Sequence, residues 1–191
     1  QFGTLENIYP NRLDLGLGRA PGTDMQTARA LRRTTQETAF SFPQDVVELQ
    51  NYFKSLDNQG AVRAFPGVGA NVPIYILGSS TSSAQLAARL GLPYAFAAHF
   101  APQQLEHAIQ IYRNQFVPSE YLSEPYVIVC VNVIGAETDE EAKLLSTTSD
   151  RFYLNVVSGK KSLLQPPVES LNGVWNHLEE NAVRVMSTYT F

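Results

Sequence analysis

Residues 72–83, with the sequence VPIYILGSSTSS, decide the fold of this 191-residue chain. Residues 72–77 form a short, continuous apolar run of the kind found in a strand that is covered on both faces. Residues 78–83 are small and polar, which is typical of a turn, and residues 84–90 have the pattern of a helix. Gly91 and Pro93, which follow directly, are typical of a helix end. A strand, a turn and a helix in this order predict one repeat of a parallel sheet.

Three further strands are expected on either side of this unit. Residues 12–18 alternate leucines with Asp14, Gly16 and Gly18, while residues 93–100 and 126–134 are apolar, and we expect the last of these strands to be buried. Asp14 shares a strand face with Gly16 and Gly18 and is expected to point into the interior, where it must be paired. Four strands can form an open sheet, whereas a closed barrel needs about eight.

Helical patterns separate these strands. Helices are expected at 23–33, 43–56, 84–90, 102–116, 138–156 and 171–185. Thr23 and Gln26 form a capping-box pair at the start of the first helix, and Pro43 suits the first turn of the second. Because strands and helices alternate, the sequence predicts parallel strands joined by right-handed crossovers and hence an α/β fold.

Composition and charge exclude several classes of protein. Apolar residues make up 44% of the chain and charged residues 17%, which is typical of a globular protein, and the net charge of −4 argues against nucleic acid as a partner. No apolar run is long enough to span a membrane. The single cysteine, Cys130, excludes an intrachain disulfide and is expected to be buried in its strand. Since no signal peptide is apparent, we expect a cytoplasmic location.

The turn after the strand at 72–77 is a candidate anion site. It lies at the carboxyl end of a strand, where α/β proteins bind ligands, and at the start of a helix, whose unpaired N–H groups and dipole attract anions. Gly78 allows close approach of the backbone, and the hydroxyls of Ser79, Ser80 and Ser83 add donors for a phosphate. The alternative is that Ser80 only caps the helix and the other serines are solvated.

Arg19 is the second candidate ligand for the same anion. It follows the strand at 12–18, so its guanidinium is expected at the same end of a parallel sheet as the serine turn, where it can form a charge-assisted bond. The alternative is an ordinary surface arginine. Gly16 and Gly18 leave one strand face bare, which suits either a flat aromatic ring or the close approach of another backbone segment.

His99 is the candidate for proton transfer. It ends the strand at 93–100 and is therefore expected at the ligand end of the sheet, although a purely structural hydrogen bond is the alternative. His107 and His177 fall on other segments, and the three histidines have no metal-ligand spacing, so no metal site is predicted.

The stretches NIYPNRLDLGLGRAPGTD (residues 7–24), ILGSSTSSAQLAA (76–88) and GLP (91–93) resemble the bacterial luciferase-like flavin monooxygenases, in particular the alkanal-monooxygenase-like branch. The resemblance implies a (β/α)8 TIM barrel that binds reduced FMN at the carboxyl ends of its strands. It also implies that Arg19 and the turn with Gly78, Ser79, Ser80 and Ser83 hold the flavin phosphate.

The resemblance covers the whole chain, yet members of the family are considerably longer. We therefore expect residues 1–191 to form a single incomplete barrel domain, roughly strands 4 to 7 with their helices. Half a barrel has two open strand edges with unpaired backbone groups. Three explanations are open. The chain is a fragment of a longer protein, it is a truncated gene product, or two copies complete each other's sheet in a homo-oligomer.

The resemblance implies an oxidoreductase that oxygenates an unknown small organic substrate with reduced FMN and O2, the reduced flavin being supplied by a flavin reductase. The chain alone is expected to bind flavin weakly and to show little turnover. The first alternative is a non-catalytic flavin-binding or assembly protein of the same fold. The second keeps the fold and replaces FMN by a deazaflavin.

Overall fold

The computed structural model describes residues 1–20, 25–31, 35–99 and 101–191. Two compact units make up the chain. The first comprises residues 1–95 and 107–128, and the second comprises residues 96–106 and 129–191. None of the helices in these described ranges combines the length and the apolar character that a bilayer crossing requires.

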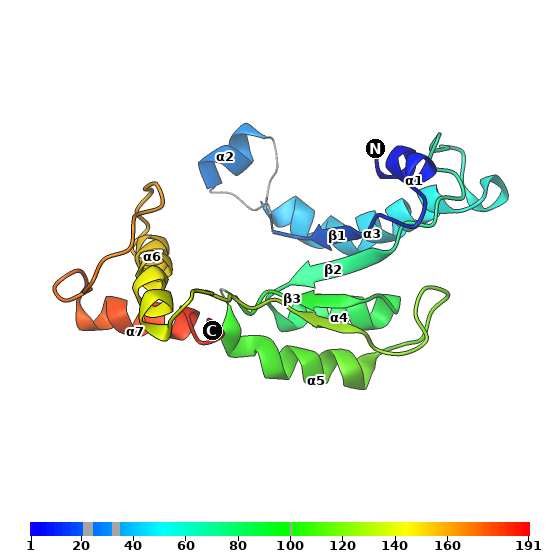
Figure 1. Cartoon of the computed structure of the whole chain (residues 1–191). Helices are drawn as coiled ribbons and strands as arrows, with labels where there is room; N and C mark the ends of the chain where they lie inside the picture. The colour runs from blue at the N-terminus through cyan, green and yellow to red at the C-terminus, as the bar shows by residue number, and fades with distance from the viewer. Residues whose placement is uncertain (21–24, 32–34, 100) are drawn as a thin grey trace. The chain divides into compact units, whose positions relative to one another are not determined.

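Helices and strands alternate along most of the chain (Figure 1). In chain order the elements are α1 (Phe2–Ile8), β1 (Leu15–Gly18), α2 (Met25–Ala30), α3 (Thr35–Phe53), the 3-10 turn η1 (Leu56–Asn58), β2 (Ile74–Gly78), α4 (Thr81–Leu90), β3 (Tyr94–Phe96), the 3-10 turn η2 (Pro102–Gln104), α5 (Leu105–Gln115), β4 (Val127–Val129), α6 (Asp139–Val157) and α7 (His177–Met186). The alternation predicted from the sequence is therefore confirmed.

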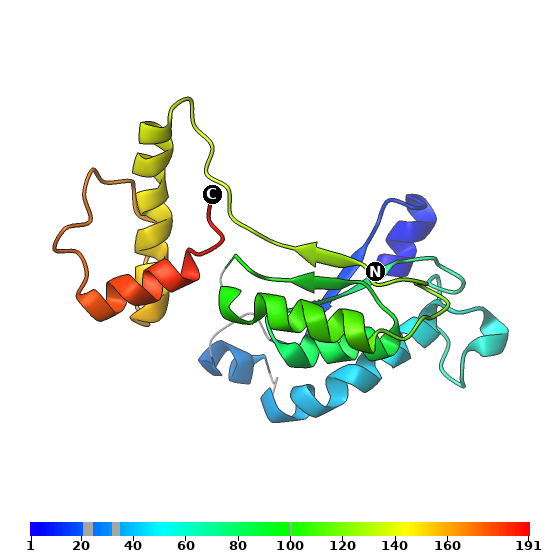
Figure 2. The same cartoon turned by 90° about the horizontal axis from the view of Figure 1, so that it is seen from below.

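The strands form one sheet in the order β1-β2-β3-β4. β1 runs parallel to β2, with Leu15 opposite Ile74 and Gly18 opposite Leu77. Figures 1 and 2 show α4 and α5 on the same side of this sheet. The parallel sheet with crossover helices confirms the α/β class.

The core of the first unit lies between the sheet and these helices. Ile76 of β2 alternates with exposed Leu77, so one face of the strand turns toward α4. The fully buried side chains of this core are Ile76, Ala84, Ala87, Ala88, Leu92, Tyr94, Ala108 and Tyr112. The small alanines of α4 allow the helix to lie close to the strands, and the rings of Tyr94 and Tyr112 pack with their centroids 5.5 Å apart.

The second unit is built around α6 and α7. Thr138 caps α6 by accepting a hydrogen bond from the N–H of Glu141 at 3.2 Å, as the capping pattern predicts. Asn176 and Glu179 form a complete capping box at the start of α7. Tyr153 of α6 and Val183 of α7 are the buried side chains of these helices.

Three predicted helix starts differ from the structure or lie outside it. The helix expected at 171–185 begins only at His177, where Asn176 caps α7. α3 begins at Thr35, so Pro43 lies inside the helix rather than in its first turn. Because proline has no N–H, this interior position costs α3 one backbone hydrogen bond. Thr23, one half of the predicted capping box, lies outside the described residues, and α2 begins at Met25. The helix α1 had no counterpart among the predicted elements.

The prediction of a buried strand at 126–134 is wrong in both length and burial. β4 contains only three residues, and Tyr126 and Val133 beside it are 51% and 74% exposed. Cys130 is exposed as well, so the expectation of a buried thiol is also wrong. The apolar run predicted cover on both faces, but the described residues cover this strand only partly. Asp14 is also exposed rather than interior, because it precedes the first residue of β1.

Candidate functional site

Arg19 and the serine turn follow adjacent, parallel strands. Gly18, the last residue of β1, lies opposite Leu77, and Gly78 then ends β2. Arg19 directly after Gly18 and the turn directly after Gly78 are therefore at the same carboxyl edge of the sheet. The Arg19 side chain is exposed. The structure thus brings the two predicted anion-binding features to one edge.

The serine turn is the start of α4. Ser80 is the N-cap residue and has an extended backbone. Its hydroxyl oxygen accepts a hydrogen bond from the N–H of Ser83 at 3.5 Å. The N–H of Ala84 makes the first backbone hydrogen bond of the helix, to the carbonyl of Ser80 at 3.3 Å. The N–H groups of the preceding residues therefore point out of the helix end, where the dipole carries about half a positive charge. Ser79 and Ser80 are half-buried.

Gly78 is required by the close approach of Ser83. A Cβ at Gly78 would lie well inside 3.0 Å of both the Cβ and the Oγ of Ser83, a separation that real Cβ atoms essentially never show. The first turn of α4 therefore rests directly on the end of β2. This contact keeps the helix N-terminus at the sheet edge.

The hydroxyl of Ser83 is engaged inside the turn. It donates to the carbonyl oxygen of Ser80 at 2.7 Å and lies 3.0 Å from the hydroxyl of Tyr94. Tyr94 in turn donates to the same Ser80 carbonyl at 3.1 Å. The roles of Gly78, Ser79, Ser80 and Ser83 as phosphate ligands stay predictions.

Tyr94 was not among the predicted site residues. Its side chain is completely buried, and burial raises the pKa of its hydroxyl, an effect that the hydrogen bond with Ser83 partly opposes. The hydroxyl is therefore a neutral donor at physiological pH. In the sequence, a tyrosine within an apolar strand is indistinguishable from an ordinary core residue, so no local signal points to this contact.

The space beside the glycines of β1 is partly filled. A Cβ at Gly16 would meet a terminal methyl of Leu77 at 2.8 Å, whereas one at Gly18 would make only ordinary contact with Leu77. The neighbour of Gly16 is thus a side chain rather than the backbone segment that the sequence suggested as an alternative. The flat ring expected on this face stays a prediction.

His99 belongs to the second unit, whereas Arg19 and the serines belong to the first. It lies beyond the end of β3, which stops at Phe96, and its side chain is half-buried. Its carbonyl accepts hydrogen bonds from the Tyr153 hydroxyl at 2.6 Å and from the Asn132 amide at 2.9 Å. These bonds fix the backbone at His99, and its catalytic role stays a prediction.

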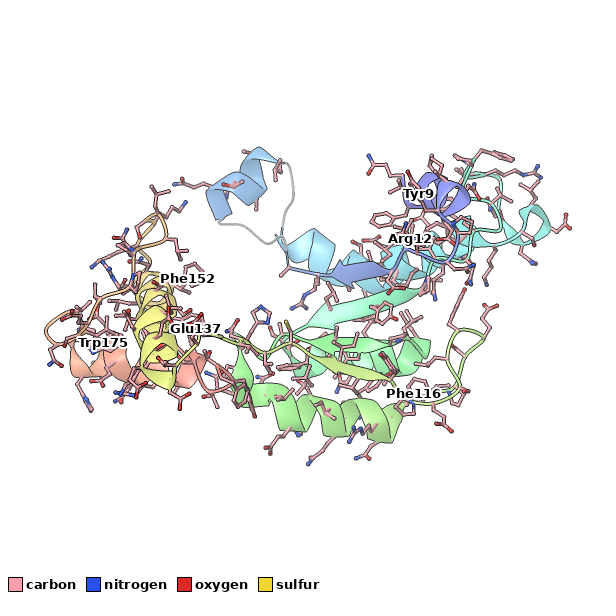
Figure 3. The ribbon with its side chains drawn as sticks, in the orientation of Figure 1. Tyr9, Arg12, Phe116, Glu137, Phe152 and Trp175 are labelled. Atoms are coloured by element: carbon pink, nitrogen blue, oxygen red, sulfur yellow. The ribbon has the colours of Figure 1, made fainter. Side chains whose placement is uncertain are left out.

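A cavity of about 480 Å³ in the second unit is bordered by His99. Its walls are mainly apolar, and Phe152, labelled on α6 in Figure 3, is one of them. The side chains that line it are His99, Asn132, Ser149, Phe152, Tyr153, Val156, Leu164 and Met186. Two of its polar residues, Asn132 and Tyr153, are those that hydrogen-bond to the His99 carbonyl.

The chain is an α/β protein with a candidate anion site at the carboxyl edge of its parallel sheet, and comparison with known proteins gives its family. The family model for luciferase-like monooxygenases matches residues 1–189. The chain therefore belongs to the luciferase-like monooxygenase family.

Curated relatives agree with this family. The chain is 52% identical over 184 residues to the uncharacterized protein YvbT of Bacillus subtilis, a match that covers 96% of this chain and 54% of YvbT. It is 45% identical over 184 residues to a luciferase-like monooxygenase of Escherichia coli K12, with 96% of this chain and 55% of the relative covered. The chain thus spans about half the length of these relatives.

Two solved structures resemble the chain. The crystal structure of apo-MsnO8 matches with a TM-score of 0.75 and 32% sequence identity, and covers 98% of this chain and 61% of that protein. An F420-dependent secondary alcohol dehydrogenase, in complex with an F420-acetone adduct, matches with a TM-score of 0.55 at 16% identity over 96% of this chain and 58% of that protein. The second match supports the fold alone.

Proposed function

We propose that the chain is the phosphate-holding part of a luciferase-like monooxygenase that uses reduced FMN and O2 to oxygenate a small organic substrate. The observation that carries this proposal is the register of β1 and β2. Because Gly18 lies opposite Leu77, Arg19 and the N-terminus of α4 share one edge of the sheet. Membership of the luciferase-like monooxygenase family supports the reaction class.

The donor set at this edge fits a phosphate. An exposed guanidinium, the first-turn N–H groups of α4 and the hydroxyls of Ser79 and Ser80 are all donors, and the helix dipole adds positive potential. Gly78 lets the first turn of α4 lie directly on the end of β2, which keeps these donors at the sheet edge. No acidic side chain lies within the turn at residues 78–83 to repel a dianion.

In this proposal each residue has a defined task. Arg19 binds the phosphate with a charge-assisted hydrogen bond, and the serine turn orients it with backbone and hydroxyl donors. Bound FMN would supply the redox chemistry, which the protein scaffold directs by fixing the position of the cofactor. His99 is proposed to hydrogen-bond or to exchange a proton with the substrate.

We further propose that the chain corresponds to strands 4 to 7 of a (β/α)8 barrel, as one incomplete domain. The four parallel strands support this, since a closed barrel needs about eight. The remaining strands would come from the rest of a longer chain or from a second copy. The relatives' lengths, about twice that of the matched part, favour the longer chain.

We also propose that the reduced flavin comes from a flavin reductase.

Two alternatives share the phosphate site. In the first, a deazaflavin takes the place of FMN at this edge of the sheet, as one structural neighbour is F420-dependent and holds an F420-acetone adduct. A non-catalytic flavin-binding protein would use the same residues without turnover. Mass spectrometry of the ligand released from purified protein distinguishes a deazaflavin from FMN. An assay with reduced FMN, O2 and a long-chain aldehyde distinguishes a monooxygenase, which turns over, from a non-catalytic flavin-binding protein, which does not.

The phosphate assignment is tested by comparing FMN with riboflavin, which lacks the phosphate. Arg19→Ala removes a charge-assisted bond worth roughly 1.5–3 kcal/mol, so its FMN dissociation constant should rise by about ten- to a hundredfold. Its affinity for riboflavin should not change. Both constants are measured by quenching of flavin fluorescence.

The matched control is Arg89→Ala. Arg89 is also exposed, but it lies in the last turn of α4, at the opposite end of the helix from the serine turn. This variant should bind FMN like the wild type. An unchanged FMN affinity of Arg19→Ala, or an equal loss of riboflavin affinity, would contradict the proposal.

A further inference from the structure

The carbonyl oxygen of Ser80 is the point on which three hydrogen bonds converge. It accepts from the N–H of Ala84 at 3.3 Å, from the hydroxyl of Ser83 at 2.7 Å and from the hydroxyl of Tyr94 at 3.1 Å. The first two donors belong to α4 itself. Only Tyr94 comes from another element, the neighbouring strand β3. The hydrogen bond from Tyr94 therefore connects the start of α4 to the sheet.

The Tyr94 hydroxyl reaches the turn from a fixed position. Its ring is fully buried and packs against the ring of Tyr112 at 5.5 Å, so it has little freedom to reorient. The peptide unit of Ser80 carries both the carbonyl that Tyr94 binds and, at its other end, the N–H of Thr81 at the helix start. Because the peptide unit is planar, holding that carbonyl also orients the N–H of Thr81, the first N–H group of α4.

We propose that Tyr94 is a positioning residue of the anion site: its buried hydroxyl fixes the Ser80 peptide so that the first-turn donors of α4 face a phosphate. This inference rests on the proposed function, in that it assumes a phosphate at the helix start. Tyr94 does not touch the ligand. It acts through Ser80 and Ser83.

Tyr112 provides a matched control within the same core. Its ring is equally buried, and its hydroxyl also makes two bonds, donating to the carbonyl of Leu92 at 2.9 Å and accepting from the N–H of Tyr126 at 3.1 Å. Leu92, however, follows the C-terminal end of α4. The two tyrosines therefore differ in which end of the helix they hold.

The test measures FMN and riboflavin affinities of Tyr94→Phe and Tyr112→Phe in the 191-residue chain. Each variant keeps its ring and loses one hydroxyl. Tyr94→Phe should raise the FMN dissociation constant by about two- to tenfold and leave riboflavin unchanged, since it weakens only the orientation of the phosphate donors. Tyr112→Phe should change neither constant, although we expect it to lower the melting temperature to a similar extent.

A general loss of stability cannot produce this selectivity, because it would affect both ligands alike. An FMN affinity of Tyr94→Phe equal to that of the wild type overturns the inference, and so does an equal loss of FMN affinity in Tyr112→Phe. If Tyr94→Phe is unfolded at the assay temperature, all variants are titrated in the same concentration of sucrose, which favours the folded state.

Arg19→Ala separates this inference from the proposed function. If Arg19→Ala weakens FMN selectively and Tyr94→Phe does not, only the role of Tyr94 is wrong. If Arg19→Ala leaves FMN affinity unchanged, the phosphate site itself is wrong and the role of Tyr94 is overturned with it.

Discussion

Replacing Gly78 by alanine should open the serine turn. The added methyl would lie well inside 3.0 Å of two atoms of Ser83, whose hydroxyl is held by Ser80 at 2.7 Å and lies 3.0 Å from that of Tyr94. Relief requires either that α4 moves away from the end of β2 or that Ser83 rotates and gives up its bonds. Two hydrogen bonds at about 1 kcal/mol each, with strain of about 1–2 kcal/mol, give a loss of about 3–4 kcal/mol in the free energy of unfolding.

Urea denaturation followed by circular dichroism measures this loss. Gly60→Ala is the matched control, because no atom lies within 4 Å of the Cβ position at Gly60, and it should change the free energy of unfolding by less than about 0.5 kcal/mol. The Ser83→Gly background removes the atoms that the methyl would overlap. Gly78→Ala should cost at least 1 kcal/mol less there, so a double-mutant cycle isolates the contact. An equal cost in both backgrounds would refute the steric argument.

Two further substitutions test other parts of the chain. Gly91→Ala should lower the free energy of unfolding by about 3 kcal/mol in the same urea assay, because Gly91 has a φ of +60° and a Cβ there would lie 2.5 Å from the carbonyl oxygen of Val117; a loss below about 1 kcal/mol would contradict this. Burial raises the pKa of Asp150 above its ordinary value of 3.8, an effect that Ser187 and Arg184 only partly oppose. Because the folded state then holds its proton more tightly than the unfolded state, this carboxyl costs stability as the pH rises through the weakly acidic range. Asp150→Asn should therefore gain melting temperature relative to the wild type between pH 4 and pH 7, and a difference that does not vary with pH would argue against the shift.

Local signals predicted the central unit of the fold well. The apolar run at 72–77, the small turn and Gly91 are signals from residues that are close in the chain, and β2, α4 and the left-handed Gly91 are all observed. The parallel direction of the strands followed from the alternation of strands and helices. Arg19 was placed at the correct edge for the same reason.

The wrong predictions share a different cause. Burial of Cys130 and of the strand around it depended on which distant segments cover that strand, and an apolar sequence alone does not contain this information. Pro43 suits a first turn, but α3 already begins at Thr35, so the proline alone did not mark the start of the helix. The hydrogen bond from Tyr94 to the Ser80 carbonyl joins residues that are fourteen positions apart in the sequence, and no motif encodes it.

Helices in proteins usually begin to unwind at their ends, where the last turns lack backbone partners. α4 has neither end loose. Its first turn is bound through Ser80 to β3, and beyond its last turn the carbonyl of Gly91 accepts from Ser119 at 2.8 Å, while that of Leu92 is held by Tyr112. We therefore expect that α4 does not fray from its ends before the rest unfolds, and that it unfolds cooperatively with its neighbouring strands.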